Sequence, residues 1–284
     1  MRPLIGLALG SGSARGWAHI GVLRALAERG VEPDVVCGCS VGALVGAAYA
    51  DGDLEKLERW VTTLTWQDVL GLLDVSLVGG LIKGDKLVAF FERHFVDKEF
   101  SALSRPFACV ATDLENGREV WLRSGSVAAA VRASIALPGL FKPVLADGRL
   151  LVDGGLVNPV PVSLCRALGA DIVIAVDLGS DRIGHLHAGP SDEPAPSSWW
   201  RRMGPRAADA RLPSLVDTLS ASVHIMQVRI ARSRMAGEPP DVAVAPRLAH
   251  LGLMDYHRGV EAIAEGRAAV DRLWPAIRHV LEGN

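Results

Sequence analysis

Residues 34–50 read DVVCGCSVGALVGAAYA, and this stretch decides the fold. Residues 34–37 are typical of a buried strand, and residues 41–50 are small and apolar, as expected of a helix packed tightly against a sheet. The turn between them, GCSVG, matches the G-x-S-x-G pattern that places a serine on a sharp strand-to-helix turn. The pattern indicates a nucleophile at Ser40, with Gly38 and Gly42 leaving room where a Cβ would clash. The same letters also occur in tight turns that carry no chemistry.

On either side of this stretch, strands and helices alternate along the first third of the chain. Residues 3–9 predict a buried strand that ends at Gly10, and residues 17–29 repeat apolar side chains at helical spacing. Strand, helix, strand and helix in this order favour a mainly parallel sheet with helices on both faces, a three-layer α/β/α fold. Further strands are expected at residues 107–112, 119–122, 150–152, 172–177 and 242–245. The first two are expected to form a hairpin through the turn at residues 116–117. Further helices are expected at residues 53–95, with a break at residues 79–80, at residues 127–134 and from residue 256 onward.

A glycine-rich turn, GSGSARG at residues 10–16, follows the first strand. Such a turn presents backbone N–H groups to an anion, which is either a bound phosphate or the oxyanion of an acyl-transfer intermediate. The dinucleotide fingerprint G-x-G-x-x-G is broken by Arg15, and no G-K-[ST] follows, so nicotinamide and P-loop nucleotide binding are disfavoured. Because turns after neighbouring parallel strands meet at one sheet edge, this loop is expected beside Ser40.

A base for Ser40 is sought among the acidic residues. Asp153 follows the short strand at residues 150–152 and precedes Gly154 and Gly155, which permit an unusual backbone path toward a site. Taken alone, Asp153 is more typical of a turn-forming residue than of a catalytic base. To act as a base for a hydroxyl, its carboxylate would have to be partly desolvated and within hydrogen-bond reach.

Three motifs therefore stand in order: GSGSARG, GCSVG and DGG. This set resembles the patatin-like phospholipases, the family of plant patatins, neuropathy target esterase and many bacterial proteins, with the nearest likeness to RssA-type bacterial members. The resemblance extends to the stretches at residues 79–87, 111–122, 133–144 and 153–162. It covers about residues 4–180, and the tail LGLMDYHRGVEAIAEG more loosely.

The resemblance implies a patatin-like fold, a Ser–Asp dyad and hydrolysis of acyl esters of phospholipids, lysophospholipids or neutral lipids, with no metal and no cofactor. It makes Ser40 the nucleophile and Asp153 the proton acceptor. The residues that it places on the oxyanion loop are Gly12, Ser13, Arg15 and Gly16. This chain carries Ser11 and Ser13 where glycines often stand, so the Ser13 side chain must turn away if its N–H is a donor.

Two other classes of function stay open. A triad α/β-hydrolase or an acyltransferase would need a catalytic histidine, and His224, His250 and His257 follow Asp153 in the required order. His19 lies near the glycine-rich turn, and a structural or surface role is expected for each of the four. A regulatory or lipid-binding member of the same fold is the second alternative, which intact Ser40 and Asp153 do not favour.

Composition excludes several further classes. With 22% charged residues and a formal net charge of −2, the chain has no basic excess for nucleic acid. Its four cysteines form no CxxC pair, which argues against zinc and favours buried, reduced thiols in a cytoplasmic protein. No apolar run reaches the length needed to span a bilayer, so we expect a soluble protein, or one peripheral to the inner membrane face.

We expect one domain over residues 1–284, with its core at about 4–180 and a helical part at 214–284. Residues 185–213 are rich in Pro and Ser and predict a mobile segment. Trp199 and Trp200 within it predict a peripheral membrane contact. The helix at about 214–234 carries an apolar stripe, for which packing on the domain and a homodimer contact are both open; its members are Leu215, Leu219, Val223 and Met226.

Overall fold

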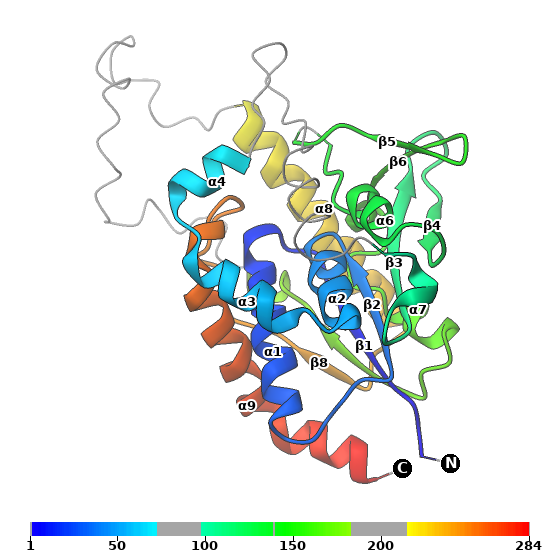
Figure 1. The fold of residues 1–284 in the computed structure, drawn as a ribbon, viewed down its shortest axis with the longest axis vertical. Coiled ribbons are helices and arrows are strands. Elements are labelled where there is room, and N and C mark those ends of the chain that lie inside the picture. The colour runs from blue at the N-terminus through cyan, green and yellow to red at the C-terminus, as the bar shows by residue number, and fades with distance from the viewer. Residues whose placement is uncertain (1, 73–97, 139, 183–214, 284) are drawn as a thin grey trace.

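The computed structural model describes residues 2–72, 98–138, 140–182 and 215–283, and its centre is one sheet (Figure 1). The strands run in the order β5-β6-β3-β2-β1-β7-β8, and β4 pairs with β3 off this path. Their bounds are β1 Ile5–Leu9, β2 Val35–Cys39, β3 Phe107–Asp113, β4 Glu119–Leu122, β5 Val144–Ala146, β6 Arg149–Asp153, β7 Ile172–Val176 and β8 Val242–Val244.

The sheet is mixed, with mostly parallel strands. Five adjacent strands are parallel to one another: β3, β2, β1, β7 and β8. β4 and β6 run antiparallel to β3, and β5 runs antiparallel to β6. The five parallel strands are nearly all buried, because helices cover both of their faces.

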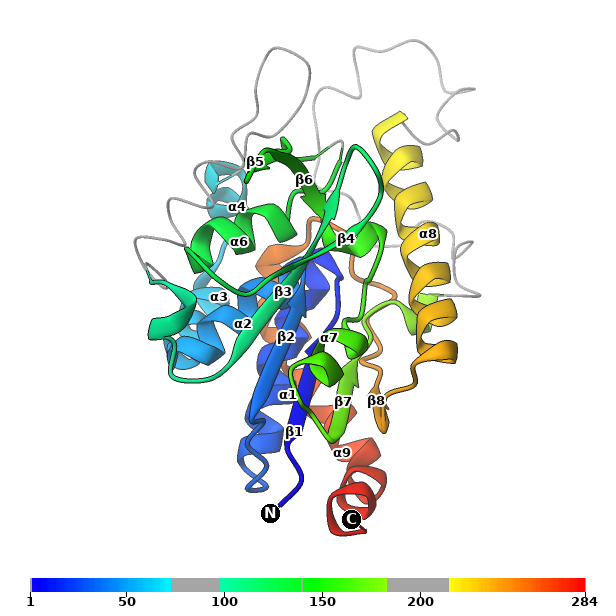
Figure 2. The ribbon, with the colours of Figure 1, turned by 90° about the vertical axis from the view of Figure 1, so that its right-hand side faces the viewer.

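Helices form a layer on each side of the sheet (Figure 2). The larger layer buries the main apolar cluster and contains α1 Ala18–Ala27, α2 Val41–Asp51, α3 Leu54–Thr63, α6 Val127–Ser134 and α9 Gly259–Glu282. On the opposite face a second apolar cluster is covered by α7 Val162–Ala167 and α8 Leu215–Gly237. The expected three-layer α/β/α architecture is confirmed.

Glycines bring α9 into backbone contact with α1. A Cβ on Gly21 would lie 1.9 Å from the carbonyl oxygen of Ile263, and a Cβ on Gly266 would lie 2.0 Å from that of Ala18. Both positions therefore require glycine. The short 3-10 turn η6, Tyr256–Arg258, immediately precedes α9. Because α9 packs closely on α1, η6 lies near the sheet edge where β1 and β2 end.

Several element boundaries differ from the sequence prediction. The strand expected at 34–37 extends through Cys39 as β2, and a 3-10 turn, η1 Ser13–Trp17, precedes α1. The helical stretch expected from residue 53 is broken earlier, between α3 and α4 Trp66–Leu72, while its expected turn at residues 79–80 lies outside the described residues. The β3–β4 hairpin is confirmed, with Gly117 at φ 70° in its turn.

Of the two alternatives for the apolar stripe of α8, packing on the domain does not hold for Met226. The side of α8 that packs on the domain carries His224, Val228 and Ala231, all buried, whereas Met226 is 51% exposed. The side chains of Leu215 and Leu219, like the whole of residues 185–213 with Trp199 and Trp200, lie outside what the structure describes. The helix turns a polar histidine inward because a buried partner, Arg15, meets it there.

Candidate active site

Ser40 stands on the turn between β2 and α2 in a backbone conformation that side chains seldom adopt. Its φ of 55° and ψ of −125° are sterically unfavourable, as expected of a nucleophile elbow. A Cβ on Gly38 would lie 2.4 Å from the Gly42 carbonyl oxygen, and one on Gly42 would lie 2.2 Å from that of Leu9. The two glycines therefore let α2 pack directly on β1 and β2, which holds the turn in place.

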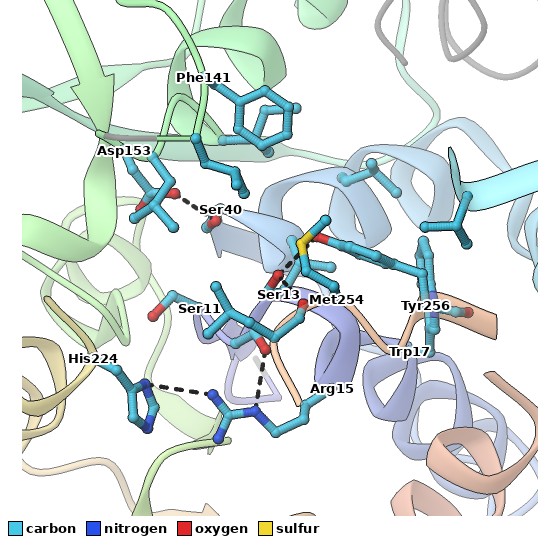
Figure 3. Close-up of a pocket in the computed structure, with 18 of the residues that line it drawn as sticks. Ser11, Ser13, Arg15, Trp17, Ser40, Phe141, Asp153, His224, Met254 and Tyr256 are labelled. Atoms are coloured by element: carbon cyan, nitrogen blue, oxygen red, sulfur yellow. Dashed lines mark hydrogen bonds between the residues drawn. The ribbon is translucent and has the colours of Figure 1, made fainter. Parts of the chain in front are cut away.

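Asp153 approaches Ser40 from the other side of β3. It ends β6 and pairs with Ala111 of β3, and β3 is also the parallel neighbour of β2. Ser40 Oγ donates a hydrogen bond of 2.6 Å to Asp153 Oδ2 (Figure 3). The Gly155 N–H donates to Asp153 Oδ1 at 2.7 Å. The serine and the carboxylate, 113 positions apart in sequence, are thus directly hydrogen-bonded.

The environment of Asp153 makes its carboxylate more basic than usual. The side chain is almost completely buried, and burial raises its pKa to about 6, although the hydrogen bonds from Ser40 and Gly155 partly oppose that rise. The close packing also explains both motif glycines. A Cβ on Gly154 would lie 2.2 Å from the Val110 carbonyl oxygen, and one on Gly155 would lie 2.4 Å from Gln227 Nε2.

The loop that follows β1 lies beside Ser40, and several of its N–H groups already have acceptors. Ser11 N donates to the Pro159 carbonyl at 2.8 Å, and Ala14 N donates to that of Leu253 at 3.3 Å. In the part of the chain that the structure describes, no protein acceptor meets the N–H groups of Gly12 and Ser13. Both residues line the same pocket as Ser40, so these two N–H groups are the available donors for an oxyanion.

The other two residues expected on this loop, Arg15 and Gly16, lie in η1. The Arg15 side chain is fully buried; its guanidinium donates to the carbonyls of Gly12 at 3.3 Å and Leu178 at 3.0 Å, and lies 3.4 Å from His224 Nδ1. It braces the loop from beneath (Figure 3). A Cβ on Gly16 would lie 2.2 Å from the Val41 side chain, so Gly16 provides close packing against α2.

Ser40 and Asp153 open into a pocket that is partly open to solvent. One part of its wall is polar and comes from the glycine-rich loop and α8, with Ser11, His224 and Gln227. The larger part is apolar and is formed by Trp17, Leu44, Trp60, Leu64, Val69, Ile135, Leu137, Leu140 and Phe141. Such a wall suits a hydrocarbon chain, whose transfer from water is favourable.

Sequence reasoning missed three residues at this site. Ser134, at the end of α6, accepts the Ser40 N–H at 2.9 Å and donates to the Val110 carbonyl at 2.7 Å, so it ties the elbow to β3. Leu253 and Tyr256, just before α9, contact Ser13. The weak similarity of the tail LGLMDYHRG to family members was the one available signal for the last two.

None of the described histidines reaches Ser40 Oγ or Asp153. His19 is buried and its Nε2 lies 2.8 Å from the Gly10 carbonyl; burial lowers its pKa to about 4, so it is neutral and donates from Nε2. His250 pairs with Glu261 at 2.5 Å, and His257 packs edge-on against Trp66. His224 does line the pocket, where it faces Arg15.

Neither a reactive thiol nor a metal site is found among the described residues. All four cysteines are free and buried, and burial raises the thiol pKa of Cys37, Cys39 and Cys109. Within the described ranges, no group of three or more His, Cys, Asp or Glu side chains is arranged to hold a metal ion. No helix in those ranges combines the length and the hydropathy of a membrane-crossing segment.

A serine on a strained strand-to-helix turn, at the edge of a mostly parallel sheet, is the arrangement seen in serine hydrolases of the α/β class. The family model for patatin-like phospholipases matches residues 7–166. An NTE family protein of Mycobacterium tuberculosis is 33% identical over 94% of this chain and 90% of its own length. The chain belongs to the patatin-like phospholipase family, a family of lipid hydrolases.

Two eukaryotic relatives contain a similar region within much longer proteins. Patatin-like phospholipase domain-containing protein 6 of Homo sapiens is 35% identical over 79% of this chain, which spans 17% of that protein. Lysophospholipase NTE1 of Mycosarcoma maydis is 33% identical over 79% of this chain and 12% of its own length.

Proposed function

We propose that this protein is a serine esterase that hydrolyses acyl esters of lysophospholipids, phospholipids or related lipids through a Ser40–Asp153 dyad. The observation that carries the proposal is the 2.6 Å hydrogen bond from Ser40 Oγ to a buried carboxylate, at the base of a mostly apolar pocket. The names of the relatives, a phospholipase domain protein and a lysophospholipase, support the class of substrate.

The reaction would proceed in two halves. Asp153 accepts the Ser40 proton as Oγ bonds to the ester carbonyl carbon, and the resulting oxyanion is stabilised by the N–H groups of Gly12 and Ser13 and by the positive end of α2. The carbonyl re-forms, and the alcohol leaves with the proton from Asp153. A water then attacks the acyl-enzyme while Asp153 accepts its proton. Asp153 returns that proton to Ser40 Oγ as the acyl–Oγ bond breaks, which releases the fatty acid and restores both residues.

The raised pKa of Asp153 suits this role. A carboxylate of ordinary pKa is a poor acceptor for a hydroxyl proton, whereas one with a pKa of about 6 is more basic and still ionised at pH 7–8. The pocket then orients the substrate. The acyl chain lies along the wall that includes Trp60 and Leu64, and the alcohol faces the polar side with Ser11 and Gln227.

Fluorophosphonate labelling and hydrolysis of a p-nitrophenyl ester test the proposal together. Ser40→Ala is expected to remove both the label and the hydrolysis without unfolding the protein. The exposed Ser104 provides the matched control, and Ser104→Ala should keep both signals. A wild-type protein that neither takes the label nor hydrolyses any ester in a panel of lysophospholipid, phospholipid and neutral glyceride would refute the esterase and favour a lipid-binding role.

A further inference from the structure

Ser13 has a conformation that normally belongs to glycine, and its side chain is held in place by a segment far along the chain. Its φ is 52°, within the left-handed region. Its Oγ lies 2.7 Å from the Leu253 carbonyl oxygen and 2.8 Å from Tyr256 Oη (Figure 3). We propose that Tyr256 is a positioning residue of the oxyanion site, which holds Ser13 in this conformation so that the Ser13 N–H faces the nucleophile.

The direction of these two hydrogen bonds follows from counting protons. A carbonyl oxygen accepts only, so the single Ser13 hydroxyl proton goes to Leu253. The Tyr256 hydroxyl must then donate to Ser13 Oγ. Burial raises the pKa of Tyr256, so the phenol keeps its proton throughout the pH range in which an esterase would be assayed. The chain Tyr256 to Ser13 to Leu253 therefore has one orientation.

The segment that carries Tyr256 is itself fixed to the loop. The Leu253 carbonyl also accepts the Ala14 N–H, and Trp17 Nε1 donates to the Tyr256 carbonyl at 3.1 Å. The Trp17 and Tyr256 rings meet edge-on with centroids 5.9 Å apart. Residues 253–256 and η1 thus form one packed unit, and a hydroxyl at its centre can fix a backbone torsion in the loop.

Ser13 needs these hydrogen bonds because it has a side chain. A glycine would enter the left-handed region at no steric cost, whereas serine there needs compensating contacts. Both hydrogen bonds of Ser13 Oγ hold the side chain against Leu253 and Tyr256, so the side chain is occupied by these partners and the N–H is available. Without the Tyr256 hydroxyl, Ser13 is expected to relax toward negative φ, which turns its N–H away from the position of the oxyanion.

This inference rests on the proposed function, and a double-mutant cycle tests it. Tyr256→Phe is expected to lower kcat for a p-nitrophenyl ester about 10-fold with KM little changed, less than the complete loss of one oxyanion donor. In a Ser13→Gly background the same change should have almost no effect, since glycine needs no support. Ser13→Ala, which keeps Cβ but loses both hydrogen bonds, should be slower than Ser13→Gly.

The other tyrosine of the chain, Tyr49, provides the matched control. Tyr49 lies at the far end of α2 against Arg105, so Tyr49→Phe should leave kcat unchanged. Equal losses from Tyr256→Phe in both backgrounds would overturn the inference, because a direct contact with substrate acts independently of Ser13. A loss confined to KM, or no loss, would also overturn it while leaving the esterase intact. Absence of activity and of Ser40 labelling in the wild type would instead refute the proposed function, and this inference with it.

Discussion

Replacing Asp153 with asparagine is expected to abolish hydrolysis and at the same time stabilise the fold. The carboxylate is desolvated in the native protein, where its pKa is about 6, against 3.8 for an unperturbed side chain. Ionising it in the folded state above pH 7 therefore costs about 3 kcal/mol relative to the unfolded chain. Asparagine is isosteric and removes this cost, and its amide can still accept from the Gly155 N–H and meet Ser40 Oγ.

The gain should be smaller than the full cost, since burying an amide has a penalty of its own. We expect about 1–2 kcal/mol, or a rise in Tm of roughly 2–6 °C for a chain of this size. Its pH dependence has a definite sign. Because the pKa of Asp153 is raised on folding, the free energy of unfolding of the wild type falls as pH rises from about 4 through 6. The stability advantage of Asp153→Asn should therefore be large at pH 8 and small at pH 4.5.

Thermal unfolding of both proteins at the two pH values measures the effect, with ester hydrolysis at pH 8 recorded in parallel. Asp113→Asn is the control: this buried carboxylate accepts from Glu115 N and Asn116 Nδ2 in the β3–β4 turn, outside the pocket, so activity should persist without a rise in Tm. A variant less stable than the wild type at pH 8, or a Tm difference identical at pH 4.5 and pH 8, would refute the desolvation argument.

Three further outcomes are expected. The kcat/KM of the wild type should fall below about pH 6 as Asp153 takes up a proton, and a flat profile down to pH 4.5 would exclude this base. His224→Ala should retain at least about a tenth of the activity, since that histidine meets Arg15; a fall to the level of Ser40→Ala would establish a triad. In liposome co-sedimentation, a Trp199→Ala/Trp200→Ala double variant should bind less than the wild type, and equal binding would remove residues 185–213 as the membrane contact.

The elbow and its surroundings could be predicted from sequence because their constraints are local. Gly38 and Gly42 are required where α2 touches β1 and β2, and this requirement appears directly as a spaced pattern of letters. The adjacency of the loop after β1 to Ser40 also followed from the topology of parallel strands. The end of this strand was harder to predict: β2 ends two residues later than expected, since Gly38 and Cys39 still pair with β3.

The orientation of α8 shows what a hydrophobic pattern alone does not determine. Apolar residues at helical spacing defined one face of this helix, but the face that packs on the domain contains His224. A hydrophobic pattern has no means of anticipating a polar side chain that is buried because a charged partner, Arg15, is buried opposite it. Such a pair stabilises an arrangement that each residue alone would disfavour.

By itself, the sequence determined the α/β class, the serine on its strained turn and the glycine-rich loop beside it, because each depends on neighbours a few positions away. The family resemblance had pointed to Asp153, but only the tertiary structure shows which distant groups contact that serine and its loop. Asp153 reaches Ser40 across 113 positions through the antiparallel pairing of β6 with β3, and Tyr256 reaches Ser13 across 243 through the packing of α9 on α1. A hydrogen bond requires its two atoms to be about 3 Å apart, and for residues so distant along the chain only the completed packing of sheet and helices sets that distance.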